Sequence, residues 1–193
     1  MYYVTTVKDT VSVPPKYIGK DITESAAEIL RNKYERTMDK SLGLILAIFN
    51  LRDVSEGYIM PEDPNTHHRV TFDVLSFSAE VEEVVVGEVS ELVEYGAFVR
   101  IGPVDALVHL SQITTDFVSF DRRSGVITSR SLGRTLKKGD VVYAKVSTVS
   151  MGNSMQSTKI ALTMRPEGLG KPEWLSEAAS VSSKSRKQKG SKR

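Results

Sequence analysis

The segment Gly87–Ile113, GEVSELVEYGAFVRIGPVDALVHLSQI, decides the fold of the region around it. It alternates apolar and polar residues on both sides of a tight turn, which predicts two short paired strands. Successive side chains of a strand point to opposite faces, so Ala97 and Val99 share one face. Phe98 and Arg100 share the other. One face is therefore predicted to be core, and the other carries an aromatic ring beside a guanidinium.

Two further strands divide their residues in the same way. In the next short strand, Ala106, Val108 and Leu110 face one way, and Asp105, Leu107 and His109 the other. In the strand 141–149, the apolar face is formed by Val142, Ala144 and Val146, and the other face by Tyr143, Lys145 and Ser147. We therefore expect three strands that each bury one face and expose a polar or aromatic one.

The exposed rings and cations fit a surface for single-stranded RNA. An aromatic side chain can stack on any base, and neighbouring cations attract the phosphates, so such a surface needs no particular sequence. Tyr95, Phe98, His109, Arg100 and Lys145 have these properties. A second interpretation remains open from spacing alone, in which Tyr95 and Phe98 only pack against neighbouring strands.

The motif V-x-x-Y-G-A-F-V followed by L-V-H-L-S resembles the S-one RNA-binding family. This resemblance implies a five-stranded OB-fold barrel whose RNA-binding face carries two aromatics, a histidine, an acidic and a basic residue. By position, Tyr95, Phe98 and His109 match the family. Ser150 stands where the acidic residue is expected, and the polar loop MGNSMQST separates it from Lys159. The expected RNA-binding residues are Tyr95, Phe98, Arg100, His109, Lys145 and Lys159.

The first 80 residues predict a different module, a small α/β unit of one main helix on an antiparallel sheet. Extended patterns at 2–13, 44–54 and 70–74 predict strands. A possible capping box at Ser25 and Glu28 and the spacing of Ala27, Leu30, Tyr34 and Met38 predict a helix from about residue 23 to 40. Gly43 is expected to stop that helix. The whole chain is therefore predicted to be of the α+β class.

Composition excludes several kinds of protein. The chain has no cysteine, which rules out disulfides, thiol nucleophiles and thiolate metal sites. Its longest purely apolar run, residues 44–49, is far shorter than a membrane-spanning helix, and the start MYYVTTVKD lacks the apolar core of a secretory signal. We therefore expect a protein of the cytoplasm.

Charge is unevenly distributed along the chain. Six of its basic residues lie between Lys184 and Arg193, so removing them from the net charge of +2 leaves the remainder at −4. The Ser- and Lys-rich tail after about Ser176 predicts disorder, and it is either a solubilising end or an RNA-binding arm.

Several other features are interpreted as structural. The adjacent His67 and His68 lack a third metal ligand at suitable spacing and are expected to be surface residues. Trp174 is expected to pack as an anchor. The basic insertion DFVSFDRRSGVITSRSLGRTLKKGD is either an extension of the RNA path or a solvated hairpin. No constellation with catalytic spacing occurs, so we expect no active site, no metal and no cofactor.

The order of the segments along the chain resembles the E-prime family of archaeal RNA polymerase stalk proteins. The resemblance rests on MYYVTTVKDTVSVPP, GYIMPEDPNTHHRVTFDVLSF, the barrel motif and GLGKPEWL, and it covers residues 1 to about 175. It implies a non-catalytic stalk subunit that pairs with the small helical F subunit of RNA polymerase, contacts the polymerase core and binds the emerging single-stranded transcript. It also implies roles in promoter opening and elongation. The domains expected are a tip domain that docks on the core and the partner subunit (1–80), the RNA-binding barrel (81–175) and the basic tail (176–193).

Two other functions remain possible from the residues alone. A free-standing RNA-binding or translation-associated protein could use the same barrel. A nuclease could use it to capture substrate, but would need acidic or histidine clusters for metal, which the sequence lacks.

Overall fold

The chain divides into two units between Ser78 and Ala79. The computed structural model describes residues 1–17, 19–129, 133–152 and 157–175. The basic tail and Arg130 of the insertion lie outside these ranges. No helix within the described ranges is long and apolar enough to cross a membrane.

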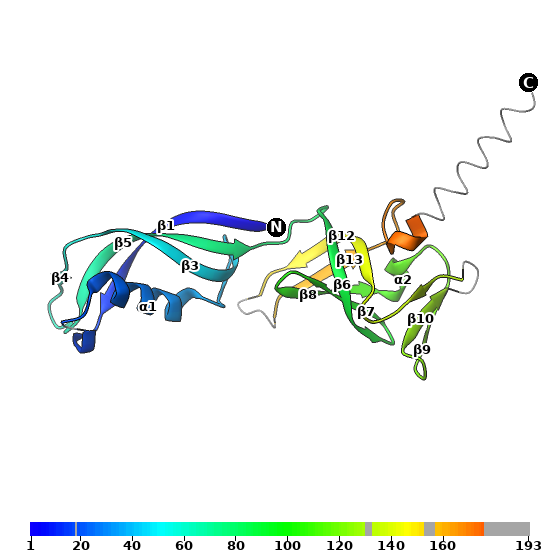
Figure 1. Cartoon of the computed structure of the whole chain (residues 1–193), viewed down its shortest axis with the longest axis horizontal. Coiled ribbons are helices and arrows are strands. Elements are labelled where there is room, and N and C mark those ends of the chain that lie inside the picture. Colours follow the sequence, from blue (N-terminus) through cyan, green and yellow to red (C-terminus); the bar gives the residue numbers. More distant parts are fainter. Residues whose placement is uncertain (18, 130–132, 153–156, 176–193) are drawn as a thin grey trace, which may run out of the picture. The chain divides into compact units, whose positions relative to one another are not determined.

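The first unit is one antiparallel sheet with a helix on one face (Figure 1). The sheet has the order β1-β5-β3-β2, and β4 pairs with β5. Its strands are β1 (Tyr2–Val13), β2 (Met38–Asp39), β3 (Gly43–Val54), β4 (Tyr58–Ile59) and β5 (Thr66–Phe77). The helices are the short 3-10 turn η1 (Pro15–Tyr17) and α1 (Ile22–Tyr34). The predicted class for this unit, one main helix on an antiparallel sheet, is confirmed.

The bounds of α1 differ from the prediction at both ends. Asp21, rather than a capping box at Ser25 and Glu28, caps the helix by accepting from the N–H groups of Thr23 at 2.8 Å and Glu24 at 3.0 Å. The helix ends at Tyr34 instead of continuing to about residue 40, because Arg36 takes a positive φ of 63° and turns the chain into β2.

The core of the first unit lies between α1 and the sheet. Ala26 and Leu30 of the helix are fully buried against Val70, Phe72 and Val74 of β5, together with residues of β1 and β3. The buried stripe therefore runs through Ala26, not through the expected Ala27 and Met38, since Ala27 is only partly buried and Met38 belongs to β2. Gly43 starts β3 and does not stop the helix.

The second unit is a closed five-stranded barrel in the order β12-β13-β8-β7-β6, as predicted. Its strands are β6 (Val84–Val93), β7 (Gly96–Ile101), β8 (Val104–His109), β12 (Val141–Ser150) and β13 (Lys159–Thr163). The interior is filled by small and branched side chains such as Val89, Val99, Val108 and Val146. A one-turn helix, α2 (Leu110–Ile113), follows β8.

The insertion between β8 and β12 folds as a small sheet of its own. It contains β9 (Val118–Asp121), β10 (Val126–Ser129) and β11 (Thr135–Leu136), in the order β11-β10-β9. Ile127 and Leu136 pair across β10 and β11 and are 1% exposed. The segment is therefore more than a solvated hairpin, since it buries an apolar contact.

Candidate nucleic-acid interface

The outer face of β7 and β8 carries the residues that the sequence singled out. Ala97, Val99 and Ile101 are buried in the barrel, while Phe98 is half-buried and Arg100 exposed. In β8, Ala106 and Val108 are buried, and His109 is exposed. The predicted alternation is confirmed on both strands, and it follows from the two-residue repeat of a strand.

Tyr95 and Phe98 form an aromatic pair at the β6–β7 turn. Their ring centroids are 6.4 Å apart and their planes meet at 85°, an edge-to-face arrangement. Tyr95 is 52% exposed. Because the two ring planes are nearly perpendicular, one base can stack on only one of them, and we call this pair the aromatic corner.

Gly96 allows the aromatic pair to form. A Cβ at this position would lie 2.2 Å from the carbonyl oxygen of Val108, so only glycine lets β7 approach β8 this closely. The turn is also tied to the end of β8, because the N–H of Leu110 donates to the carbonyl of Tyr95 at 3.0 Å.

His109 caps the short helix that follows β8. Its Nδ1 accepts from the backbone N–H of Ser111 at 3.3 Å and lies 2.9 Å from the Ser111 hydroxyl oxygen. Because Nδ1 accepts a hydrogen bond, the neutral ring carries its proton on Nε2. The exposed edge of His109 therefore presents an N–H donor, which suits a phosphate or a base oxygen.

The strand registers place most of the expected residues in three rows across the outer face of β7, β8, β13 and β12. Phe98 lies opposite Leu107, which lies opposite Ala161. Two residues along, Arg100 lies opposite Asp105, and extending the parallel β8–β13 register by two residues puts Lys159 at the same level. In the other direction, the same extension of the register puts His109 level with Thr163, which lies opposite Lys145. Five of the six expected residues thus occupy one continuous outer surface, and Tyr95 lies at its end.

Two of the three cations on this surface are engaged with carboxylates. Arg100 Nε lies 3.3 Å from Asp105 Oδ1, and Lys145 Nζ lies 2.7 Å from Glu82 Oε2. The side chains of Asp105 and Glu82 are 48% and 71% exposed, and solvent-exposed pairs contribute about 0 to 1 kcal/mol, so a phosphate can compete for the cations. Lys159 is exposed and makes no ion pair with any described residue.

Carboxylates on β6 border this surface. Glu88 lies opposite Arg100, and Glu91 lies opposite Phe98, across the β6–β7 ladder. Because these acids repel phosphate, they favour a nucleic-acid path that runs from β7 over β8 toward β13, away from β6.

The structure adds residues that were not among the expected RNA-binding residues, although Asp105 and Leu107 were correctly expected to face outward with His109. Leu107 is a half-buried apolar side chain in the same row as Phe98, and Asp105 places a negative charge between Arg100 and Lys159. Phe117, just before β9, has a ring that is 67% exposed. Arg122 of the insertion forms an ion pair with Glu94, next to Tyr95 in the chain. The two phenylalanines of this largely polar insertion, Phe117 and Phe120, were the signal that could have indicated Phe117.

His67 and His68 were wrongly expected at the surface. Both lie on β5, where His68 is 9% exposed and its Nδ1 is 2.9 Å from the Ser55 carbonyl oxygen. His67 Nε2 is 2.8 Å from Asp63 Oδ2, and its ring stacks on Tyr58. Among the described residues no cluster could hold a metal ion.

Trp174 packs as an anchor, as predicted. It is 6% exposed and fills the space beside Gly170, where a Cβ would lie 2.8 Å from the indole ring. The guanidinium of Arg134 lies 5.5 Å from the ring centroid, within the range of a cation–π contact. This ring is therefore not available as a stacking platform.

Comparison with known proteins gives matches to both units. Residues 8–64 match the SHS2 domain found in the N terminus of Rpb7p/Rpc25p/MJ0397, and residues 78–159 match the S1 RNA binding domain. The chain is 39% identical to DNA-directed RNA polymerase subunit Rpo7 of Sulfolobus acidocaldarius over 184 residues, 95% of this chain and 100% of the relative.

Two other relatives extend this similarity. The chain is 40% identical to the subunit Rpo7 of Saccharolobus shibatae over 92% of this chain and 99% of that protein. It is 28% identical to DNA-directed RNA polymerase III subunit RPC8 of Saccharomyces cerevisiae over 50% of this chain and 45% of that protein. The similarity to the archaeal relatives covers both units.

Proposed function

Because this chain belongs to the Rpo7 family of DNA-directed RNA polymerase subunits, we propose that its barrel binds the single-stranded transcript as it leaves the polymerase. The protein is a non-catalytic stalk subunit of a nucleotidyltransferase and carries an RNA-binding domain. We also propose that it pairs with the small helical F subunit, contacts the polymerase core through its first unit, and assists promoter opening and elongation. Its proposed location is the cytoplasm, where an archaeal polymerase works.

The observation that carries the proposal for RNA is the aromatic corner of Tyr95 and Phe98 beside the Nε2 donor of His109. Stacking on a ring contributes roughly 1 to 3 kcal/mol per base and does not depend on which base is present. A surface that every transcript must cross needs this tolerance, because base-edge recognition would favour some sequences over others.

Phosphates are held by the row of charges next to the rings. Lys159 is exposed and ready to pair with a phosphate, and Arg100 becomes available when the phosphate displaces the exposed carboxylate of Asp105. Lys145 lies one strand further and can contact a longer transcript in the same way. The binding that results is modest.

Modest binding is sufficient for one component of a larger assembly. Tethering the barrel to the polymerase raises the effective concentration of the RNA near it, to the order of millimolar for a short connection. The transcript can therefore slide across the surface without being trapped on it.

Photo-crosslinking on the assembled polymerase tests this proposal. A photoreactive phenylalanine replaces Phe98 in one variant and Val86, an exposed residue on the outer side of β6, in the control. We expect transcript to crosslink at position 98 and not at position 86. A complex that contains this chain but crosslinks RNA equally at both positions, or only at position 86, would overturn the proposed path.

A further inference from the structure

The sheet of the first unit has one face that no described helix covers. Helix α1 packs on the face formed by Val11, Val70 and Phe72. On the other face, residues of β1 and β5 pair in rows, which are Tyr2 with Phe77, Val4 with Leu75, Thr6 with Asp73, Lys8 with Thr71, and Thr10 with Arg69. Strand β3 continues three of these rows with Ala47, Phe49 and Arg52. We call this surface the open face.

One end of the open face is apolar. Val4 is 64% exposed and Tyr2 56% exposed, and the tyrosine ring packs edge-on against Phe77 at 5.2 Å. Leu75 and Phe49 lie beside them and are half-buried. Exposed apolar side chains such as Tyr2 and Val4, adjoining further half-buried apolar residues, are typical of a protein-interaction surface.

The middle of the open face is held rigid by a buried carboxylate. The side chain of Asp73 is 4% exposed and accepts from the Thr6 hydroxyl at 2.7 Å and from Asn50 Nδ2 at 3.3 Å. It also pairs with Arg52, whose side chain remains 58% exposed. These bonds connect β1, β5 and β3, so the face is preorganised for binding.

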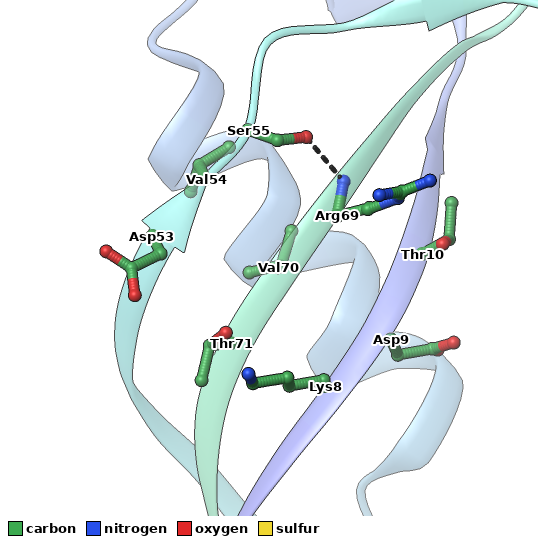
Figure 2. A pocket seen from close by; sticks show the side chains of 9 residues that line it. All are labelled: Lys8, Asp9, Thr10, Asp53, Val54, Ser55, Arg69, Val70 and Thr71. Atoms are coloured by element: carbon green, nitrogen blue, oxygen red, sulfur yellow. Dashed lines mark hydrogen bonds between the residues drawn. The ribbon is translucent and has the colours of Figure 1, made fainter.

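The other end of the open face is cationic. A hollow of about 630 Å³ lies at this end, lined by residues of β1, β5 and β3. In Figure 2, Lys8 extends toward Thr71, Arg69 lies beside Thr10, and α1 lies behind the sheet. Lys8 and Arg69 are exposed and form no ion pair with any described residue. Two acids also line the hollow: Asp9 is bound by Lys33 at 3.0 Å, and Asp53 is exposed and forms no ion pair with any described residue. The two cations Lys8 and Arg69 thus outnumber the one carboxylate that is not neutralised. The hollow is therefore suited to carboxylates.

We propose that the open face binds one amphipathic helix of another polymerase component, apolar at the Val4 end and acidic at the Lys8 and Arg69 end. The five rows extend over about 27 Å, which matches a helix of about 18 residues. Such a helix would complete a three-layer arrangement, with α1 on one face of the sheet and the partner helix on the other. The inference rests on the proposed function, because it takes the partner from the same polymerase.

A second copy of this chain fits the open face poorly. The apolar side of α1 is already buried, and its exposed surface mixes Glu24 and Glu28 with Arg31 and Lys33. No described helix therefore offers an apolar stretch followed by an acidic one.

Crosslinking on the polymerase, assembled with the full-length chain, tests the inference. A photoreactive phenylalanine replaces Val4 or Leu75, and the same residue at Arg31 on α1 serves as the control. We expect positions 4 and 75 to crosslink to one peptide of another polymerase component that combines apolar and acidic residues. Crosslinks to RNA, to a second copy of this chain or to a basic peptide would overturn the inference, as would no crosslink in an intact complex.

Reversing the charge of the cationic end provides an independent test of the inference. The double variant Lys8→Glu with Arg69→Glu should weaken incorporation into the polymerase by roughly tenfold or more, whereas Arg31→Glu should not. Replacing the acidic residues of the crosslinked peptide by lysine should restore the incorporation of the double variant into the polymerase. If the unaltered chain never joins the polymerase, the proposed function itself fails. If it joins and the double variant joins equally well, only this inference fails.

Discussion

The backbone N–H of Leu110 donates to the carbonyl of Tyr95 at 3.0 Å, which ties the start of α2 to the turn that carries the exposed ring. His109, the residue before Leu110, caps the same helix. One hydrogen bond thus fixes the position of a stacking ring relative to that of an Nε2 donor. The RNA-binding geometry that we propose depends on this link between the β6–β7 turn and the end of β8.

Removing either ring of the aromatic corner should weaken RNA binding. Tyr95→Ala and Phe98→Ala should each reduce the affinity for a short single-stranded RNA by roughly 1 to 3 kcal/mol, because each loses a stacking surface. A filter-binding titration at fixed salt measures this loss. Tyr58→Ala, which removes an exposed ring from the first unit, is the matched control and should bind normally. Unchanged affinity in both barrel variants would remove the rings from the site.

His109 has two roles that substitution can separate. Asparagine can still accept from the N–H of Ser111 and cap α2, whereas alanine cannot, and losing an N-cap costs about 0.5 to 2 kcal/mol of stability. We therefore expect His109→Asn to keep its thermal stability and lose RNA affinity, and His109→Ala to lose both. Thermal unfolding followed by circular dichroism, together with RNA titration, compares the variants. Full RNA affinity in His109→Asn would show that the ring makes no contact.

Much of this fold could be predicted from alternation of residue types. The two-residue repeat of β7 and β8 correctly separated buried Val99 from outward Phe98 and Arg100. The end of α1 could not be predicted, because Arg36 adopts a positive φ that no glycine marks in the sequence. Asp21 and Ser25 are both capping residues by type, and the local pattern favoured the wrong one.

The charged partners of the site residues could not be predicted from sequence patterns. Lys145 was singled out as a cation, but its partner Glu82 is 63 residues away in the chain and comes beside it only when the barrel closes. Likewise, the burial of His68 depends on Ser55 and Gly57, which approach it across the sheet. Local propensity carries no information on contacts of this kind.

The buried carboxylate of the open face should make the first unit sensitive to acid. The hydrogen bond from Thr6, followed by those from Asn50 and Arg52, lowers the pKa of Asp73 below its usual value. A lowered pKa in the folded state means that ionised Asp73 stabilises the fold above the pKa of the unfolded chain. This stabilisation is lost as the pH falls through the folded-state pKa.

Asp73→Asn should therefore flatten the dependence of stability on pH in the acidic range. Urea denaturation of the full chain at a series of pH values from about 7 to 3 measures the free energy of unfolding at each pH. Asp53→Asn is the control, because this exposed carboxylate on β3 accepts no hydrogen bond from the described residues. Parallel pH profiles for the native chain and Asp73→Asn would contradict the assignment.

The carboxylate of Asp105 should lower the affinity of the barrel for RNA. It lies between Arg100 and Lys159 in the register of the outer surface, pairs with Arg100, and must be displaced before a phosphate can use that cation. Asp105→Asn should therefore tighten RNA binding and steepen its salt dependence, by up to about 0.7 in the slope of log affinity against log salt for one added phosphate contact on a single strand. Titrations at several salt concentrations measure both quantities, with Glu24→Gln on α1 as a charge-matched control. Weaker binding in Asp105→Asn would mean that the carboxylate orients Arg100 for the transcript and does not compete with it.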